Sequence, residues 1–102
     1  MNPLDLSTIS EIQVSPDVIS QEVFFEETLL MDVKTMAYFG LDPLGTSLWK
    51  RINDGEQPDT LVENLSGEFD LEREAAERKC AGIVFALQKT GLVRLVEKGR
   101  AT

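Results

Sequence analysis

The sequence predicts a small α+β domain of the winged-helix type, with a three-stranded antiparallel sheet, then three helices, then a short C-terminal strand. Two observations lead to this class. β-prone runs dominate the chain before Asp42, and turn signals such as Ser15-Pro16-Asp17 separate them. From Asp42 onward, apolar residues recur at helical spacing between recognisable start and stop signals. The 102 residues suffice for one domain and are too few for two cores.

Three runs are expected to form the sheet: residues 18–23, 28–33 and 36–41. Three strands with one apolar face are about the minimum for stability, and they need a helical layer to cover that face. Side chains alternate faces along a strand, so Met36 and Tyr38 would share one face of the third strand. Phe39 and Leu41 would share the other. The third strand is therefore apolar on both faces, which is more than one small core can use.

Capping signals place the first two helices. Asp42 can accept a backbone N–H as N-cap, Pro43 suits the first helical position, and Gly55 suits the exit. The second helix is expected to open at Pro58 and to stop at Ser66-Gly67.

The third and longest helix is expected to be capped by Asp70 and to end at Lys89 and Gly91. Trp49 on the first helix and Cys80 on the third fall within apolar stripes, so both are predicted to be core residues.

The ends of the chain carry weaker signals. Residues 1–12 are expected to form a flexible N-terminal arm, residues 13–96 the folded domain and residues 97–102 a C-terminal tail. Within the domain, residues 92–96 are expected to form the short closing strand.

Composition excludes several classes of function. The chain has no histidine and one cysteine, so no internal disulfide, zinc site or ordinary general base is expected. No apolar run approaches the roughly 20 residues of a membrane helix. The first residues lack the basic and apolar regions of a secretory signal. We therefore expect a cytoplasmic protein that is not an enzyme, binds no cofactor and does not enter a membrane.

The net charge of −8 is unevenly distributed. Residues 1–70 carry 14 acidic and 3 basic side chains, whereas residues 71–102 carry 4 acidic and 7 basic ones. Affinity for DNA comes mostly from neutralised phosphates, so a chain this acidic without a continuous basic stripe is poorly suited to it. The basic final third could instead attract an acidic peptide, although uneven charge on a solvated surface explains the same pattern equally well.

The segment YFGLDPLGTSLWKRINDGEQPDTLVENL, followed by a helix that ends in LQKTGLV, resembles the PqqD-like proteins, also called RiPP recognition elements. The resemblance covers roughly residues 14–96. It rests on an aromatic-rich third strand, a Leu-Asp step into a helix, and a terminal Leu-x3-Gly-Leu. The matching positions are Tyr38, Phe39, Leu41, Asp42, Gly45, Leu48, Trp49, Gly55, Phe69, Leu87, Gly91 and Leu92.

The resemblance implies a binding function. Proteins of this family bind the leader segment of a ribosomally synthesised precursor peptide, which a modifying enzyme or a leader protease then processes. The leader adds itself as a strand antiparallel to the third strand, in a cleft that the third helix closes. Main-chain hydrogen bonds supply affinity in this mode, and side-chain pockets supply selectivity.

From this mode we expect the contacts to come from the third strand and the third helix. On the helix, Phe85 lies about 140° from Cys80, off the core stripe, with Ala81 one turn before it. Gly82 departs from the pattern of the family, because glycine inside a helix costs about 1 kcal/mol relative to alanine. It indicates either that the helix is not straight or that something approaches its backbone closely. The candidate peptide-binding residues are Lys34, Met36, Ala37, Tyr38, Phe39, Gly40, Arg78, Lys79, Ala81 and Phe85.

Simpler interpretations stay open for several of these residues. Lys34 suits a turn, Met36 and Tyr38 could merely cover the outer face of the sheet, and Phe85 could be buried by the arm. For the whole chain, the alternatives are a winged-helix DNA-binding regulator or a structural adaptor subunit. Whether the chain forms a homodimer through the open sheet edge also stays open.

Overall fold

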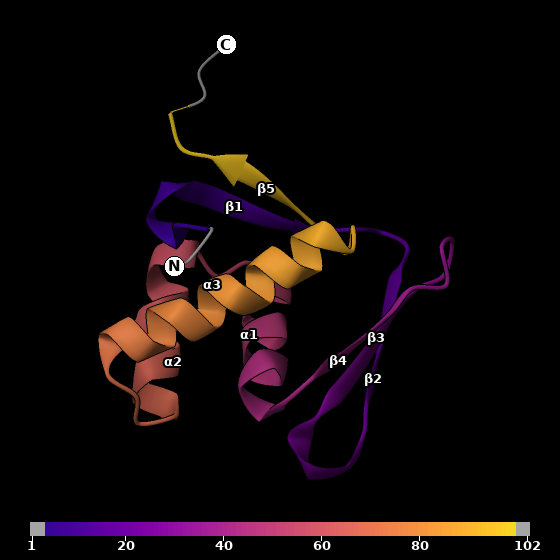
Figure 1. The fold of residues 1–102 in the computed structure, drawn as a ribbon, viewed down its shortest axis with the longest axis horizontal. Helices are drawn as coiled ribbons and strands as arrows, with labels where there is room; N and C mark the ends of the chain where they lie inside the picture. The colour runs from indigo at the N-terminus through magenta and orange to yellow at the C-terminus, as the bar shows by residue number, and fades with distance from the viewer. Residues whose placement is uncertain (1–3, 100–102) are drawn as a thin grey trace.

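The computed structural model describes residues 4–99, and in that part of the chain two small antiparallel sheets pack against three α-helices (Figure 1). The three-stranded sheet has the order β2-β3-β4, and the two-stranded sheet pairs β1 with β5. The strands are β1 (Ile9–Val14), β2 (Val18–Glu22), β3 (Thr28–Asp32), β4 (Tyr38–Leu41) and β5 (Val93–Glu97). The helices are α1 (Pro43–Asn53), α2 (Pro58–Glu68) and α3 (Arg73–Lys89), with short 3-10 turns η1 (Leu6–Thr8) and η2 (Phe24–Glu26).

The predicted fold class is confirmed, and the expected three-stranded sheet, three helices and closing strand follow one another in the predicted order. The structure adds a strand, β1, before them. The third strand is shorter than expected, because Met36 adopts a positive φ of 65° and stays in the turn before β4. In the sheet, Leu30 pairs with Phe39 and Thr28 with Leu41, which turns Leu30 and Leu41 into the core.

The prediction of a flexible arm over residues 1–12 is wrong from Leu6 onward. Residues 6–8 form η1, and β1 pairs with β5 from Val14 opposite Val93 to Ile9 opposite Glu97. Leu6 and Ile9 are buried, and Leu6 belongs to the cluster formed by α2 and α3. Burial of these two apolar side chains therefore holds residues 6–14 against the rest of the domain. Of the predicted tail, Glu97 ends β5, and residues 100–102 lie outside the described part.

Most helix boundaries follow the predicted signals, but α2 continues through the predicted stop at Ser66-Gly67 and ends at Glu68. The Asp42 carboxylate accepts a hydrogen bond from the Gly45 N–H at 2.7 Å. After the end of α1, Gly55 adopts a φ of 82°. Asp70 does not cap α3: it adopts a φ of 51°, and the N-cap is Glu72. Leu71 N–H instead bonds to the Ser66 carbonyl, so the chain makes one further turn before α3 begins.

The core consists of two clusters that share α1 and α3. One lies between α2 and α3, and the other lies where α1 and the end of α3 meet β3, β4 and β5. Trp49 and Cys80 are both buried, as predicted. Within residues 4–99, no helix has both the length and the apolar character that crossing a bilayer requires.

Burial of Ile9 leads to a prediction about β1. Ile9→Ala should lower the free energy of unfolding by about 2–5 kcal/mol, the usual cost of truncating a buried isoleucine. Glu11→Ala, on an exposed side chain of the same strand, is the matched control and should change it by less than about 0.5 kcal/mol. Urea titration measures both. An unchanged midpoint for Ile9→Ala would mean that β1 is not part of the folded unit.

Candidate functional site

Strand β4 lies at one edge of its sheet, so one side of its backbone has no partner strand in the described chain. The Asp32 N–H donates to the Ala37 carbonyl at 3.0 Å, next to the Met31–Tyr38 pair. Hydrogen-bonded and non-bonded pairs alternate along an antiparallel ladder. Phe39 and Leu41 therefore direct their backbone groups at β3, whereas those of Tyr38 and Gly40 point to the open edge.

A groove of about 470 Å³ lies between this edge and α3. Its apolar walls come from β4 and the start of α1 on one side and from the middle of α3 on the other. An open strand edge and an apolar groove thus lie side by side. The lining residues are Phe39, Gly40, Leu41, Asp42, Leu44, Arg78, Lys79, Gly82, Ile83 and Ala86.

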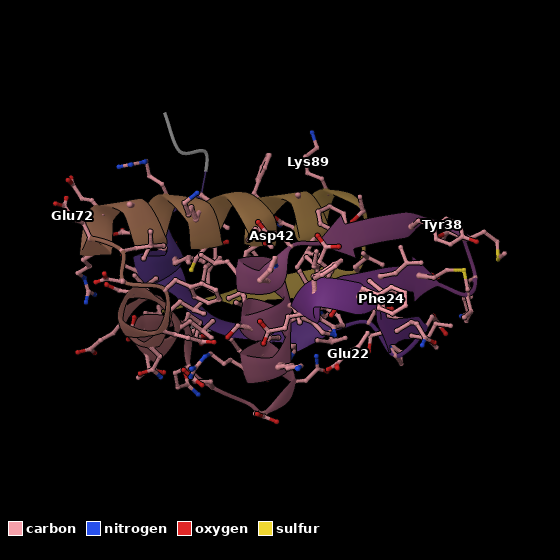
Figure 2. The ribbon with its side chains drawn as sticks, turned by 90° about the horizontal axis from the view of Figure 1, so that it is seen from below. Glu22, Phe24, Tyr38, Asp42, Glu72 and Lys89 are labelled. Carbon is pink, nitrogen blue, oxygen red and sulfur yellow. The ribbon has the colours of Figure 1, made fainter. Side chains whose placement is uncertain are left out.

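The turn from β4 into α1 forms one end of the groove. Asp42 lies where β4 meets α1, beneath α3 in Figure 2. A side chain at Gly45 would come within 3.0 Å of Leu41, so glycine lets α1 start close against the last residue of the strand. Because Asp42 caps α1 and Gly45 packs close to Leu41, the helix begins directly after β4. The chain therefore leaves the sheet without covering the open edge of β4.

Two cations stand on the α3 side of the groove. Arg78 and Lys79 are exposed, and neither forms an ion pair with a residue in the described part of the chain. By contrast, on α1, Lys50 is paired with Glu22. Arg51 is paired with Glu56 of the α1–α2 connection and with Glu68 of α2. The cations beside the groove are therefore free to meet a carboxylate from outside the chain.

The structure brings four of the predicted site residues together in the groove: Phe39, Gly40, Arg78 and Lys79. Ala37 ends the turn before β4, and Tyr38 is 61% exposed on the outer face of the sheet. Lys34 and Met36 lie in the β3–β4 turn, where Lys34 pairs with Asp17 at 3.6 Å.

Ala81, which we expected to contact a ligand, is 0% exposed in the cluster between α2 and α3 and does not line the groove. Phe85 is half-buried outside the groove lining, with the Lys89 ammonium 5.6 Å from its ring centre. Six further residues line the groove and were not predicted as site residues: Leu41, Asp42, Leu44, Gly82, Ile83 and Ala86. The sequence alone does not identify these residues as one site, because they come together only through the packing of α3 near β4.

The outer side of the sheet carries a larger apolar surface than the predicted pair of Met36 and Tyr38. Ile19, Met31 and Tyr38 form a row across the three strands. At the β2–β3 connection, Phe24 and Phe25 are 84% and 88% exposed. Tyr38 and Phe24 are both labelled on the sheet side of the molecule in Figure 2.

A second hollow, of about 480 Å³, lies between β1 and the α1–α2 connection. Its lining is mostly polar, and its acidic Glu56 already pairs with Arg51 at 3.2 Å. This hollow therefore offers less apolar surface than the groove beside β4.

The described residues offer no cluster suited to a metal ion. Burial raises the pKa of the Cys80 thiol to about 11, so this thiol stays protonated and unreactive near neutral pH. The groove with its open edge is suited to holding an extended chain by main-chain pairing.

Residues 27–93 match the family model described as coenzyme PQQ synthesis protein D (PqqD). This chain belongs to the PqqD family. The matched region runs from the start of β3 to the start of β5, so it includes both walls of the groove. No curated protein sequence matches the chain.

Two solved structures resemble this PqqD-family chain over nearly their whole length. One is described as "TbiB1 in Complex with the TbiA(beta) Leader Peptide", with 28% identity, a TM-score of 0.73, and 88% of this chain and 99% of that chain covered. The other is described as "Lasso peptide synthetase B1 complexed with the leader peptide", with 25% identity, a TM-score of 0.74, and 83% and 99% covered.

Proposed function

We propose that this chain binds the leader segment of a ribosomally synthesised precursor peptide by adding it as a strand to β4. The observation that carries the proposal is the open edge of β4, with the backbone of Tyr38 and Gly40 directed outward, beside an apolar groove. A leader strand on this edge gains main-chain hydrogen bonds, and its side chains on one face enter the groove. The descriptions of the two similar structures as leader-peptide complexes support this function.

The role that we propose is delivery and not catalysis. The sequence has no histidine, and the buried Cys80 has a raised pKa, so the common nucleophile–base pairs cannot be assembled from these residues. A carrier in the cytoplasm would hold the leader while a modifying enzyme or leader protease acts on the rest of the precursor. The same edge could pair with a second copy of the chain, and leader binding would then compete with a homodimer.

Strand addition predicts that blocking the outward N–H of residue 38 prevents binding. Tyr38→Pro removes that donor at an edge position where proline is tolerated, so leader binding should fall by at least about tenfold while the fold is kept. Fluorescence titration with a labelled leader peptide and a thermal melt measure the two quantities.

The matched control is Ser20→Pro. The Val23 N–H bonds to the Glu27 carbonyl, and the same alternation directs the backbone of Ser20 to the far edge, on β2. Ser20→Pro should leave leader affinity unchanged. If Tyr38→Pro folds and binds normally, or if Ser20→Pro abolishes binding, the leader does not pair with β4.

Delivery requires a second surface for the enzyme, and the Phe24–Phe25 pair suits it. Phe25 and Glu26 adopt positive φ angles of 63° and 60°, which cost non-glycine residues about 1–3 kcal/mol each. This strained turn holds two phenylalanines in water with Glu26 and Glu27 beside them, and Glu22, which pairs with Lys50, lies nearby. An apolar tip with an acidic rim fits an apolar pocket rimmed by basic residues on the partner enzyme.

The double variant Phe24→Ser/Phe25→Ser should therefore bind the leader peptide within about twofold of the original affinity but slow carrier-dependent processing of the precursor by at least about tenfold. A processing assay with the enzyme that acts on the same precursor measures this. Val33→Ser, on an exposed apolar residue in the β3–β4 turn, is the control and should process normally. If the double variant supports processing at the original rate, the Phe24–Phe25 pair is not the surface that docks on the enzyme.

A further inference from the structure

Gly82 lies in the interior of α3 and has no role that the fold requires. Glycine in a helix interior is unfavourable relative to alanine, because it loses more backbone entropy on folding. Two structural needs commonly justify it: a positive φ, as at Gly91, or close packing, as at Gly45, where an added Cβ would lie 3.0 Å from Leu41. Gly82 shows neither. It has helical geometry, and a Cβ added there would meet nothing within 4 Å.

The space in front of Gly82 belongs to the groove. Gly82 lines the α3 wall together with Ile83 and Ala86, opposite Phe39 and Leu44. A side chain at position 82 would project into open groove space instead of into the protein. The absence of a side chain at position 82 therefore leaves room in the groove for a group from another molecule.

The two unpaired cations lie about one helical turn from this position. With a rise of about 1.5 Å per residue, Lys79 and Arg78 stand roughly 4.5 and 6 Å from Gly82 along the axis of α3. In an extended peptide, side chains on one face recur every two residues, about 6.5–7 Å apart. A peptide that places one side chain at Gly82 would therefore bring the side chain two residues away close to these cations.

We propose that Gly82 determines which leaders bind: it admits a large apolar side chain against the backbone of α3, and Arg78 and Lys79 receive a carboxylate two residues away. The preferred ligand is a leader segment in which a large apolar residue and an acidic residue are separated by one position. This inference rests on the proposed function, because it describes the contents of the groove once a leader has paired with β4.

A random 12-residue peptide library displayed on phage, selected against the full chain, is a suitable probe because it samples every apolar and acidic spacing at once. Enriched peptides should contain a large apolar residue and an aspartate or glutamate two positions apart. For Arg78→Glu/Lys79→Glu the acidic preference should disappear while the apolar one remains. Enriched peptides without this spacing would overturn the predicted specificity.

The decisive variant is Gly82→Leu, titrated with the most enriched peptide. Filling the groove should weaken binding about 10–100-fold, which corresponds to losing the burial of one large apolar side chain. The melting temperature should stay the same or rise, because leucine is a better helix former than glycine. The matched control is Gly67→Leu, at an exposed position of α2 where an added Cβ also meets nothing within 4 Å. It should bind normally.

The outcomes separate this inference from the proposed function. Normal binding by Gly82→Leu, with Tyr38→Pro still inactive, would overturn the role of Gly82 and leave strand addition in place. A lower melting temperature for both Gly82→Leu and Gly82→Ala would also overturn it, because the glycine would then serve the fold. If the original chain enriches no peptide, the proposed function fails, and the role of Gly82 fails with it.

Discussion

The binding surface depends on how the chain leaves the three-stranded sheet. Asp42 caps α1 directly after the last residue of β4, so the chain turns into a helix before it can add a further strand. The remaining strands, β1 and β5, pair with each other in a separate sheet. The outward backbone groups of Tyr38 and Gly40 consequently have no strand partner in the described chain. Both residues are exposed, so their outward backbone groups are available for the strand pairing that we propose.

This arrangement also sets the energetic scale of binding. Each main-chain hydrogen bond exchanged for water contributes about 0.5–1.5 kcal/mol net, and ordering the peptide backbone costs a comparable amount per residue. Pairing along the four-residue strand β4 therefore fixes the register of the peptide but adds little net affinity. Apolar burial in the groove has to supply most of the remainder, and the exposed cations on α3 mainly set orientation and association rate. Selectivity should accordingly depend on α3 more than on β4.

Local signals predicted most of the fold, and long-range contacts account for what was missed. The Asp42 cap and the exits at Gly55 and Gly91 depend on neighbouring residues, so the sequence reveals them directly. Strand β1 was missed because its partner lies some 80 residues away and a register shift between Ile9 and Glu11 breaks its alternation. Asp70 was misassigned as a cap because the extra turn before α3 depends on a backbone bond from Leu71 to Ser66.

The candidate site was predictable in outline and not in detail, for the same reason. The edge strand and the two cations follow from the order of elements, but the groove depends on how α3 rotates against its neighbours. Ala81 was predicted to contact the ligand because the sequence analysis assumed a single buried face of α3, centred on Cys80. Packing of α2 against α3 widens the buried arc and covers Ala81.

Residue-resolved amide hydrogen exchange tests the central claim most directly. It is measured by NMR on the free chain and on the chain saturated with a leader peptide. If the leader pairs with β4, the amides of Tyr38 and Gly40 should exchange freely in the free chain and slow by at least about tenfold in the complex. Phe39, already bonded to β3, should change little. Protection that appears instead at Ser20 and Glu22 on the far edge, or along β1, would contradict the account.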